Sequence, residues 1–200
     1  MIIKVCGMRD AENIRELEAL GADWMGMIFW PHSRRYVAQC PSYLPGSLKK
    51  VGVFVDADED YIRRYAKACQ LDIIQLHGHE PPALATALRP LTVIKAFSIA
   101  SVEDLQQTKP YEGVADYFLF DTKGKSAGGN GQKFDWSLLH HYHGQTPFLL
   151  SGGIGPEDAE SLRAFHHPMW AGIDLNSRFE TEPGLKDITK LREFTKQLRS

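Results

Sequence analysis

Met-Ile-Ile-Lys-Val-Cys-Gly-Met-Arg-Asp, residues 1–10, is the stretch of this sequence that decides its fold. A β-branched run that ends in a cysteine predicts a strand over residues 2–6, and Gly7 turns the chain. Asp10 can then cap a helix over residues 11–20. The chain therefore begins with a strand, a turn and a helix.

The first strand places two reactive side chains on one face. Side chains alternate along a strand, so Lys4 and Cys6 face one way while Ile3 and Val5 face the other. If the apolar pair packs under helices, Lys4 and Cys6 point into a sheet or barrel. Cys6 then lies at the carboxyl end, where α/β folds bind their ligands. We therefore expect chemistry at Cys6, although a free cysteine is often only a small buried hydrophobe.

The rest of the chain repeats this alternation. Strands are predicted over residues 2–6, 24–30, 50–55, 73–77, 92–97, 117–121, 146–151 and 169–175. Helices are predicted over residues 11–20, 58–70, 81–88, 102–107, 136–142, 156–165 and 185–198. A helix should also occupy residues 38–47, but Pro41, Pro45 and Gly46 leave room for only a turn or two. Helix 2 is therefore predicted to be degenerate.

Eight strand–helix units predict an α/β fold, a single (βα)8 TIM barrel that spans residues 1–200 as one catalytic domain. No composition shift or linker marks a second domain. The competing architecture is an open doubly wound sheet. Against it, no Gly-x-Gly-x-x-Gly follows the first strand, and polar residues stand at nearly every strand end rather than at one switch point.

Composition excludes several classes of protein. A net charge of −2 with scattered Lys and Arg gives no footprint for nucleic acid. No apolar run approaches the roughly 18 residues of a membrane span, so no membrane partner is expected and the protein is predicted to be cytoplasmic. Cys6, Cys40 and Cys69 are three cysteines at wide spacings, which suits neither a disulfide framework nor a zinc site. They are expected to be free thiols in a reducing compartment, with Cys69 in the core.

Polar side chains gather where the strands end, which is the face on which barrels build active sites. They are Lys4, Cys6, Gln75, His77, Lys95, Asp121, Ser151, Asp174 and Asn176. A buried Lys4 needs an anionic neighbour, for which Asp121 and Asp174 are the candidates. His77 has no partners at metal-ligand spacing, so it is assigned no chemistry and no metal site is predicted.

The loops after strands seven and eight predict a phosphate site. Gly152 and Gly153 let the backbone approach an anion, and Asn176 and Ser177 form the neighbouring loop. These two loops are the frequent phosphate site of barrels, although a pair of tight turns is the alternative. A second glycine-rich run, residues 123–131, is a candidate mobile lid beside strand six.

A set of short motifs runs along nearly the whole chain. They are Lys-Val-Cys-Gly-Met (4–8), Pro-His-Ser-Arg-Arg-Tyr-Val (31–37), Val-Gly-Val-Phe-Val (51–55), Gln-Leu-His-Gly (75–78), Ile-Lys-Ala-Phe (94–97), Phe-Asp-Thr (120–122), Gly-Gly-Asn-Gly (128–131) with Phe-Asp-Trp (134–136), Leu-Ser-Gly-Gly-Ile (150–154), Ile-Asp-Leu-Asn-Ser (173–177) and Pro-Gly-Leu-Lys-Asp (183–187). In order and spacing this set closely resembles phosphoribosylanthranilate isomerase.

The resemblance implies an Amadori rearrangement in tryptophan biosynthesis. The aminoaldose N-(5-phosphoribosyl)anthranilate would become the aminoketose 1-(2-carboxyphenylamino)-1-deoxyribulose 5-phosphate. A small-molecule substrate is implied, with neither metal nor organic cofactor, and the oligomeric state is expected to be a monomer or a weak homodimer. Another phosphosugar isomerase or epimerase, or a non-catalytic sugar-phosphate-binding barrel, stays open as an alternative, since fold does not imply function.

The resemblance also implies roles for individual residues. Cys6 matches the general base that removes the proton from ribose C2, and Asp121 matches the general acid for the ring oxygen. Arg35 matches the arginine for the anthranilate carboxylate, and Asp174 an aspartate near the ribose and amine. Lys4 is placed with these substrate-binding residues, and from its strand face it can favour the Cys6 thiolate.

One departure from the family pattern falls in the predicted phosphate site. Where the family commonly has Ser-Ser-Gly-Val-Glu, residues 176–180 read Asn-Ser-Arg-Phe-Glu. Arg178 is therefore expected to make a turn that a glycine would ease. Arg34, the neighbour of Arg35, is expected to be solvated.

Overall fold

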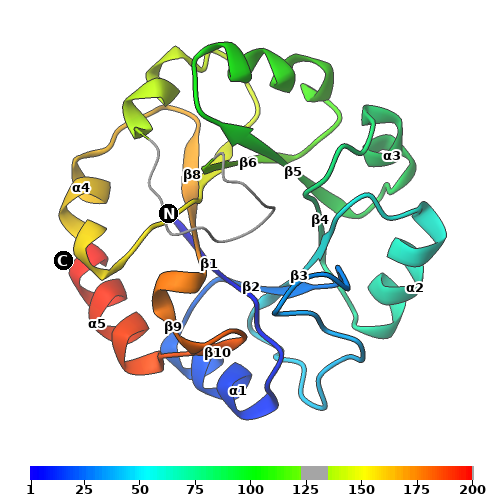
Figure 1. Cartoon of the computed structure of the whole chain (residues 1–200), viewed down its shortest axis with the longest axis vertical. Coiled ribbons are helices and arrows are strands. Elements are labelled where there is room, and N and C mark those ends of the chain that lie inside the picture. Colours follow the sequence, from blue (N-terminus) through cyan, green and yellow to red (C-terminus); the bar gives the residue numbers. More distant parts are fainter. Residues whose placement is uncertain (123–134, 200) are drawn as a thin grey trace.

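The structure, a computed structural model, describes residues 1–122 and 135–199. Within these ranges eight parallel strands form a closed barrel in the order β1-β2-β3-β4-β5-β6-β7-β8 (Figure 1). Each strand pairs with the next in sequence, and β8 pairs with β1 to close the sheet. The predicted α/β barrel is thus confirmed.

The strands are β1 (Ile2–Cys6), β2 (Trp24–Ile28), β3 (Lys49–Phe54), β4 (Ile73–Leu76), β5 (Thr92–Ile99), β6 (Tyr117–Thr122), β7 (Phe148–Leu150) and β8 (Trp170–Leu175). The α-helices are α1 (Ala11–Leu20), α2 (Glu59–Ala68), α3 (Pro82–Ala87), α4 (Ala159–Ala164) and α5 (Ile188–Arg199). The 3₁₀ helices are η1 (Glu103–Tyr111), η2 (Trp136–His141), η3 (Pro156–Asp158) and η4 (Ser177–Phe179). A small hairpin, β9 (Glu180–Glu182) and β10 (Leu185–Lys186), precedes α5.

Helix α1 has the boundaries predicted from the sequence. The Asp10 side chain accepts a hydrogen bond from the Asn13 backbone N–H, which is worth about 1 kcal/mol at an N-cap. Gly21 ends the helix in a left-handed conformation with φ of +78°, as glycine can without a Cβ clash. Ile14 and Leu17 are fully buried and fasten the helix to the barrel.

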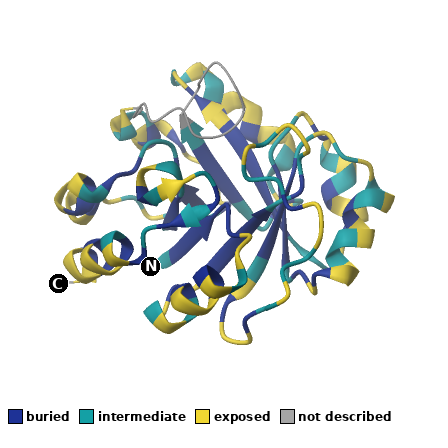
Figure 2. Ribbon diagram, turned by 60° about the horizontal axis from the view of Figure 1, so that its bottom comes forward, coloured by how far each residue is buried: buried dark blue, intermediate teal, exposed yellow. Residues whose placement is uncertain are grey.

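The alternation along the strands produces two apolar layers. Ile3 and Val5 belong to the large layer between strands and helices, where the helices turn their exposed faces outward (Figure 2). Val51, Ile94 and Leu149 belong to the smaller cluster of the barrel interior. As predicted, Lys4 faces the other way from Ile3 and is fully buried. The buried lysine therefore has to find its partner inside the barrel.

The connection between β2 and β3 contains no helix, as the prolines predicted. Its backbone is instead tied to α2 by two tyrosines. Tyr61 donates from its hydroxyl to the Phe29 carbonyl at 3.3 Å, and Tyr65 donates to the Ala38 carbonyl at 3.2 Å. These contacts hold the connection in the position that a helix would otherwise fix.

A disulfide between Cys40 and Cys69 forms a third tie in the same place. The expectation that both are free thiols is therefore wrong, although Cys69 is buried in the core as predicted. Cys40 and Cys69 are 29 residues apart in the sequence, and this spacing alone does not predict that they pair. The end of α2 lies beside the helix-less connection, and the two Cα atoms are 5.5 Å apart, within the usual range for a disulfide.

Two predicted helices, over residues 102–107 and 136–142, take the tighter 3₁₀ form. The hairpin of β9 and β10 was not predicted, because strands of three and two residues are too short for a periodic pattern. None of the described helices is long and apolar enough to cross a membrane.

Candidate active site

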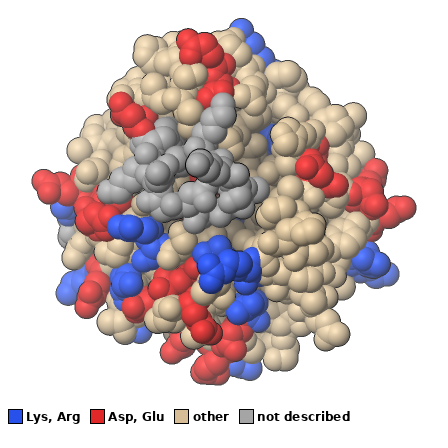
Figure 3. Space-filling model, viewed as in Figure 1, with Lys and Arg blue, Asp and Glu red and all other residues tan. Residues whose placement is uncertain are grey.

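A cavity of about 260 Å³ opens where the barrel strands end. Its walls include most of the residues predicted for the site, namely Cys6, Arg35, Asp121, Gly152, Gly153, Asp174, Asn176 and Ser177. The remaining one, Lys4, is fully buried behind the cavity wall. On the face seen in Figure 3, basic and acidic side chains lie next to one another rather than in separate patches.

Cys6 ends β1 and is the free cysteine of the described chain. Gly26 on β2 lies beside it, and a Cβ there would come within 2.7 Å of the Cys6 Sγ, so only glycine leaves the thiol its space. Burial raises the pKa of Cys6, and Lys4 and Lys186 only partly oppose this effect. Lys4 does favour the thiolate, as expected, but burial outweighs it. Cys6 is therefore a neutral thiol in the free protein at neutral pH.

Lys4 pairs with Asp174 across the seam between β1 and β8. Its Nζ lies 2.8 Å from Asp174 Oδ1, and the two side chains are 0% and 7% exposed. Burial lowers the pKa of Lys4, but Asp174 and Cys6 raise it by more, so the ammonium stays charged. The other Asp174 oxygen lies 3.5 Å from Ser151 Oγ at the cavity wall. Of the two candidate partners for Lys4, Asp174 is the one in contact.

Asp121 reaches the cavity from β6. Two strands, β7 and β8, separate β6 from β1, so Asp121 and Cys6 approach the cavity from different directions. His77 Nε2 lies 3.5 Å from Asp121 Oδ2, and Gln75 Nε2 lies 2.7 Å from His77 Nδ1. The sequence assigned His77 no chemistry, but the structure places it between Gln75 and the candidate acid.

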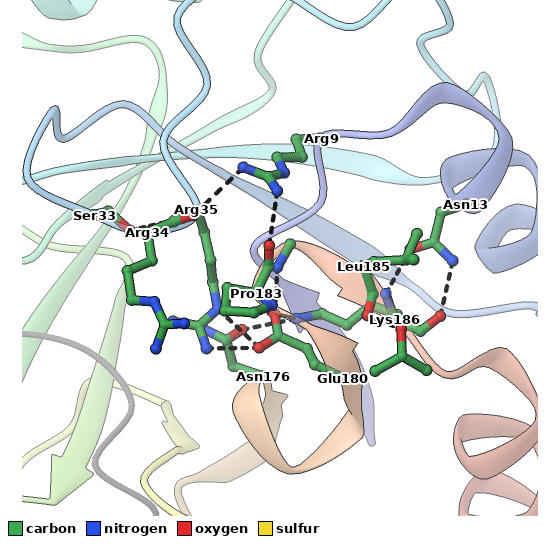
Figure 4. A network of polar contacts seen from close by, with 12 residues as sticks. Arg9, Asn13, Ser33, Arg34, Arg35, Asn176, Glu180, Pro183, Leu185 and Lys186 are labelled. Atoms are coloured by element: carbon green, nitrogen blue, oxygen red, sulfur yellow. Dashed lines mark hydrogen bonds and ion pairs between the residues drawn. The ribbon is translucent and has the colours of Figure 1, made fainter.

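Arg35 is held by a carboxylate of the hairpin after β8 (Figure 4). Glu180 accepts from Arg35 Nε at 2.8 Å and from Nη2 at 2.6 Å, and Lys186 Nζ lies 2.6 Å from the same carboxylate. Lys186 Nζ also donates to Asn176 Oδ1 at 2.8 Å. Burial alone would raise the pKa of Glu180, but the hydrogen bonds from Arg35 and Lys186 hold it at about 2. Arg34 is exposed at the cavity rim, as expected.

The two predicted phosphate loops meet at the cavity. Gly152 and Gly153 have φ of +83° and +73°, so their turn needs glycine. With no side chains, they leave the main chain of the loop open to a ligand. Asn176 and Ser177 line the cavity next to them. The candidate lid, residues 123–131, lies outside the described residues.

Arg178 causes none of the strain expected of it. It lies within η4, and the non-glycine residues with positive φ in the described chain are Asp56 and Gln70. A 3₁₀ turn replaces the turn that a glycine would make, so arginine is compatible with it. Arg178 Nη2 pairs instead with Glu157 Oε1 at 2.7 Å on the surface.

Comparison with known proteins identifies the relatives of this chain. The family model of N-(5'-phosphoribosyl)anthranilate (PRA) isomerase matches residues 3–197. The chain belongs to this family. A PRA isomerase of Parabacteroides distasonis is 53% identical, with 99% of this chain and 93% of the relative covered. One of Phocaeicola vulgatus is also 53% identical, with 100% and 98% covered.

Solved PRA isomerase structures have the same barrel. That of Thermus thermophilus superposes with a TM-score of 0.87 at 31% identity, covering 100% of this chain and 98% of the other. Another PRA isomerase, in complex with reduced 1-(o-carboxyphenylamino)-1-deoxyribulose 5-phosphate, superposes with a TM-score of 0.82 at 30% identity, covering 100% and 99%. The resemblance found from the motifs is thereby confirmed, and the chain is an isomerase.

Three residues near the cavity, His77, Glu180 and Lys186, were not predicted from the sequence. His77 stood at a strand end beside Gln75, but its acidic neighbour Asp121 comes from another strand, β6, and is 44 residues away in the sequence. Glu180 and Lys186 lie in two of the quoted stretches, residues 176–180 and 183–187, yet nothing in their spacing links them to Arg35. The available clue was that Glu180 and Lys186 both lie in family motifs that follow the last strand.

Proposed function

We propose that Cys6 and Asp121 are the general base and general acid of the PRA isomerase reaction. The observation that carries the proposal is that both line one cavity from different directions. Asp121 gives its proton to the ring oxygen as the C1–O bond breaks, which opens the furanose to a Schiff base. Cys6 then takes the proton from C2, which gives an enolamine, and this becomes the aminoketone as C1 gains a proton and the C2 hydroxyl loses one.

The buried thiol suits a base that is needed only after ring opening. Burial raises the pKa of Cys6, so the resting enzyme does not hold a buried thiolate. Ring opening creates a positive charge on the substrate nitrogen, and this charge favours the thiolate when C2 must lose its proton. Lys4 contributes in the same direction from behind the cavity wall.

The remaining residues are proposed to hold the two ends of the substrate. Backbone donors around Gly152, Gly153, Asn176 and Ser177 would bind the phosphate, since glycines bring the main chain close to an anion. Arg35 would bind the anthranilate carboxylate. A related isomerase was solved with a ligand that carries a phosphate at one end and a carboxyphenyl group at the other, which supports this assignment of the two ends.

At the ribose between these ends, Asp174 is proposed to accept hydrogen bonds from the substrate hydroxyl or amine. Lys4 compensates its charge and so fixes the carboxylate in place. We propose that no metal or organic cofactor takes part, because both proton transfers are assigned to side chains of this chain. Residues 1–200 are proposed to form one catalytic domain that works in the cytoplasm as a monomer or weak homodimer.

Turnover of freshly prepared phosphoribosylanthranilate tests the acid and base assignments. Cys6→Ser and Asp121→Asn should each lower kcat by roughly 10²- to 10⁴-fold, with the affinity for a product analogue within a few-fold. Because both groups act on one reaction, the double variant should be little worse than the poorer single variant. Glu59→Gln, on the exposed face of α2, is the control and should keep its kcat, and a chelator should change nothing. Full activity in Cys6→Ser would assign proton removal to another group, with Asp174 the first to test.

A further inference from the structure

We propose that Glu180 is the positioning residue that presents Arg35 to the carboxylate of the substrate, an inference that rests on the proposed role of Arg35. A guanidinium has two edges that can each bind a carboxylate by two hydrogen bonds. Glu180 occupies the edge made by Nε and Nη2, at 2.8 and 2.6 Å. The edge made by Nη1 and the second N–H of Nη2 is left for a ligand. In the described chain no residue accepts a hydrogen bond from Nη1, and Arg35 lines the cavity.

Glu180 is itself fixed, so it can fix Arg35. Its side chain is only 5% exposed, and it accepts from Lys186 Nζ at 2.6 Å and from the Gly184 N–H at 3.0 Å. Lys186 is in turn bound to α1 through Asn13, whose side chain accepts from the Lys186 N–H and donates to the Lys186 carbonyl. Figure 4 shows this series of contacts running from α1 to the guanidinium. If the Arg35 side chain rotated away, it would lose its hydrogen bonds from Nε and Nη2 to Glu180.

The same cluster lies against the turn that follows the proposed base. A Cβ on Gly7 would come within 2.7 Å of Arg35 Cδ, 2.9 Å of Asn176 Oδ1 and 3.3 Å of Lys186 Nζ. Arg35, the phosphate loop and the backbone after Cys6 are thus packed together around a glycine. The position of Arg35 relative to Cys6 and the phosphate loop is therefore set by direct contact.

The charges of the cluster leave room for one more anion. Arg35 and Lys186 bring two positive charges, and Glu180 brings one negative charge. A bound carboxylate would balance the remaining positive charge in a partly buried place, where imbalance is costly. Without Glu180, two cations would face each other, and Arg35 would turn away from Lys186. Glu180 therefore sets both the orientation of the Arg35 guanidinium and the net charge of the cluster that would contact the substrate.

The test compares two stable product analogues. One is reduced 1-(o-carboxyphenylamino)-1-deoxyribulose 5-phosphate, and the other is the same compound with phenyl in place of the carboxyphenyl group. In Glu180→Gln, inhibition by the carboxylated analogue should weaken by about 10- to 150-fold, the worth of a charged hydrogen bond. Inhibition by the phenyl analogue should stay within about threefold. Glu59→Gln removes a similar carboxylate from Arg63, 2.7 Å away on the exposed face of α2, and should change neither constant.

Two further variants keep the test decisive. Glu180→Asp retains the charge but is too short for the two-point contact, and it should show the same selective loss to a smaller degree even if Glu180→Gln folds poorly. Arg35→Lys tests the underlying assignment, since a lysine cannot offer a fork. If Arg35→Lys loses the preference for the carboxylated analogue while both Glu180 variants keep it, Glu180 does not position Arg35. Equal losses for both analogues in the Glu180 variants would show a purely structural role. An unchanged preference in Arg35→Lys would overturn the assignment of Arg35 itself.

Discussion

Two groups of paired charges near Cys6 differ in their net charge. Lys4 and Asp174 are one cation and one anion across the barrel seam, and both are buried. Arg35 and Glu180 lie at the cavity wall together with Lys186, so that group keeps one positive charge. The charges of the inner pair cancel each other, so Asp174 keeps only hydrogen-bond acceptors for the proposed substrate, whereas the outer cluster in its proposed role also keeps a net charge and a donor edge. Two ion pairs at one cavity can thus differ in net charge, and the variants below test what each contributes.

The largest effect should come from breaking the inner pair. Lys4→Met leaves the Asp174 carboxylate buried without its cation, which costs about 3 to 5 kcal/mol of the free energy of unfolding. Urea denaturation followed by circular dichroism measures the change. Lys4→Met combined with Asp174→Leu should be more stable than Lys4→Met alone, because no buried charge is left. If the double variant is the less stable of the two, the pair does not act as a self-neutralising unit.

The outer cluster depends on a connection that the inner pair does not use. Arg35 lies on the helix-less segment between β2 and β3, which the disulfide of Cys40 and Cys69 ties to α2. Cys40→Ser should lower the free energy of unfolding by about 2 to 4 kcal/mol, because the unfolded chain regains its freedom. Denaturation under non-reducing conditions tests this. A reducing agent should lower the stability of the wild type to a similar degree and leave Cys40→Ser unchanged, and equal sensitivity of both proteins would contradict the prediction.

Glu180 of the outer cluster and Lys4 of the inner pair should respond to opposite ends of the pH range. The pKa of Glu180 is held at about 2 in the folded protein, against an ordinary value of 4.5, so its contribution to stability is complete above about pH 4.5 and is lost as pH falls toward 2. The pKa of Lys4 is raised above its ordinary 10.5, so its contribution is complete below that pH and is lost at still higher pH. The wild type should therefore lose stability more steeply than Glu180→Gln between pH 4.5 and 3. Parallel curves would show that Glu180 is not the group involved.

The smallest effect is expected at an exposed pair outside both clusters. Arg178 and Glu157 are about half exposed, and such pairs are worth roughly 0 to 1 kcal/mol. Arg178→Ala should leave the free energy of unfolding and the affinity for inorganic phosphate nearly unchanged.

Gly153→Val is the comparison for phosphate binding. It should weaken the affinity for inorganic phosphate clearly, because φ of +73° disfavours a β-branched residue. A larger loss of affinity in Arg178→Ala than in Gly153→Val would place the arginine, rather than the main chain, on the phosphate.

The parts of the molecule that follow from local periodicity could be predicted from the sequence. The first strand, the capped α1 and the inward direction of Lys4 each depend on residues within a turn or two of one another. The gathering of Cys6 and Asp121 at one cavity follows because parallel barrel strands end on the same face. Position in the fold was therefore enough to collect most of the candidate site.

Contacts between distant segments could not be predicted in the same way. Cys40 and Cys69 approach each other only because the end of α2 lies beside a connection that has lost its helix. Glu180 reaches Arg35 through a hairpin too short to give a pattern. The pKa of Cys6 also depends on burial, which the spacing of Lys4 and Cys6 in the sequence does not show. Each of these features arises only when the closed barrel brings distant segments together.

The polar contacts near the cavity join the two ends of the chain. Lys4 and Asp174 are 170 residues apart, Arg35 and Glu180 are 145 apart, and Asn13 and Lys186 are 173 apart. Contacts of such long range form late, since a large loop must close before they can. On the ribosome, where the N-terminal part emerges first, Lys4 and Arg35 wait without their partners until the last strand and hairpin have been made. The barrel thus gains these contacts only after residues 174–186 have been made.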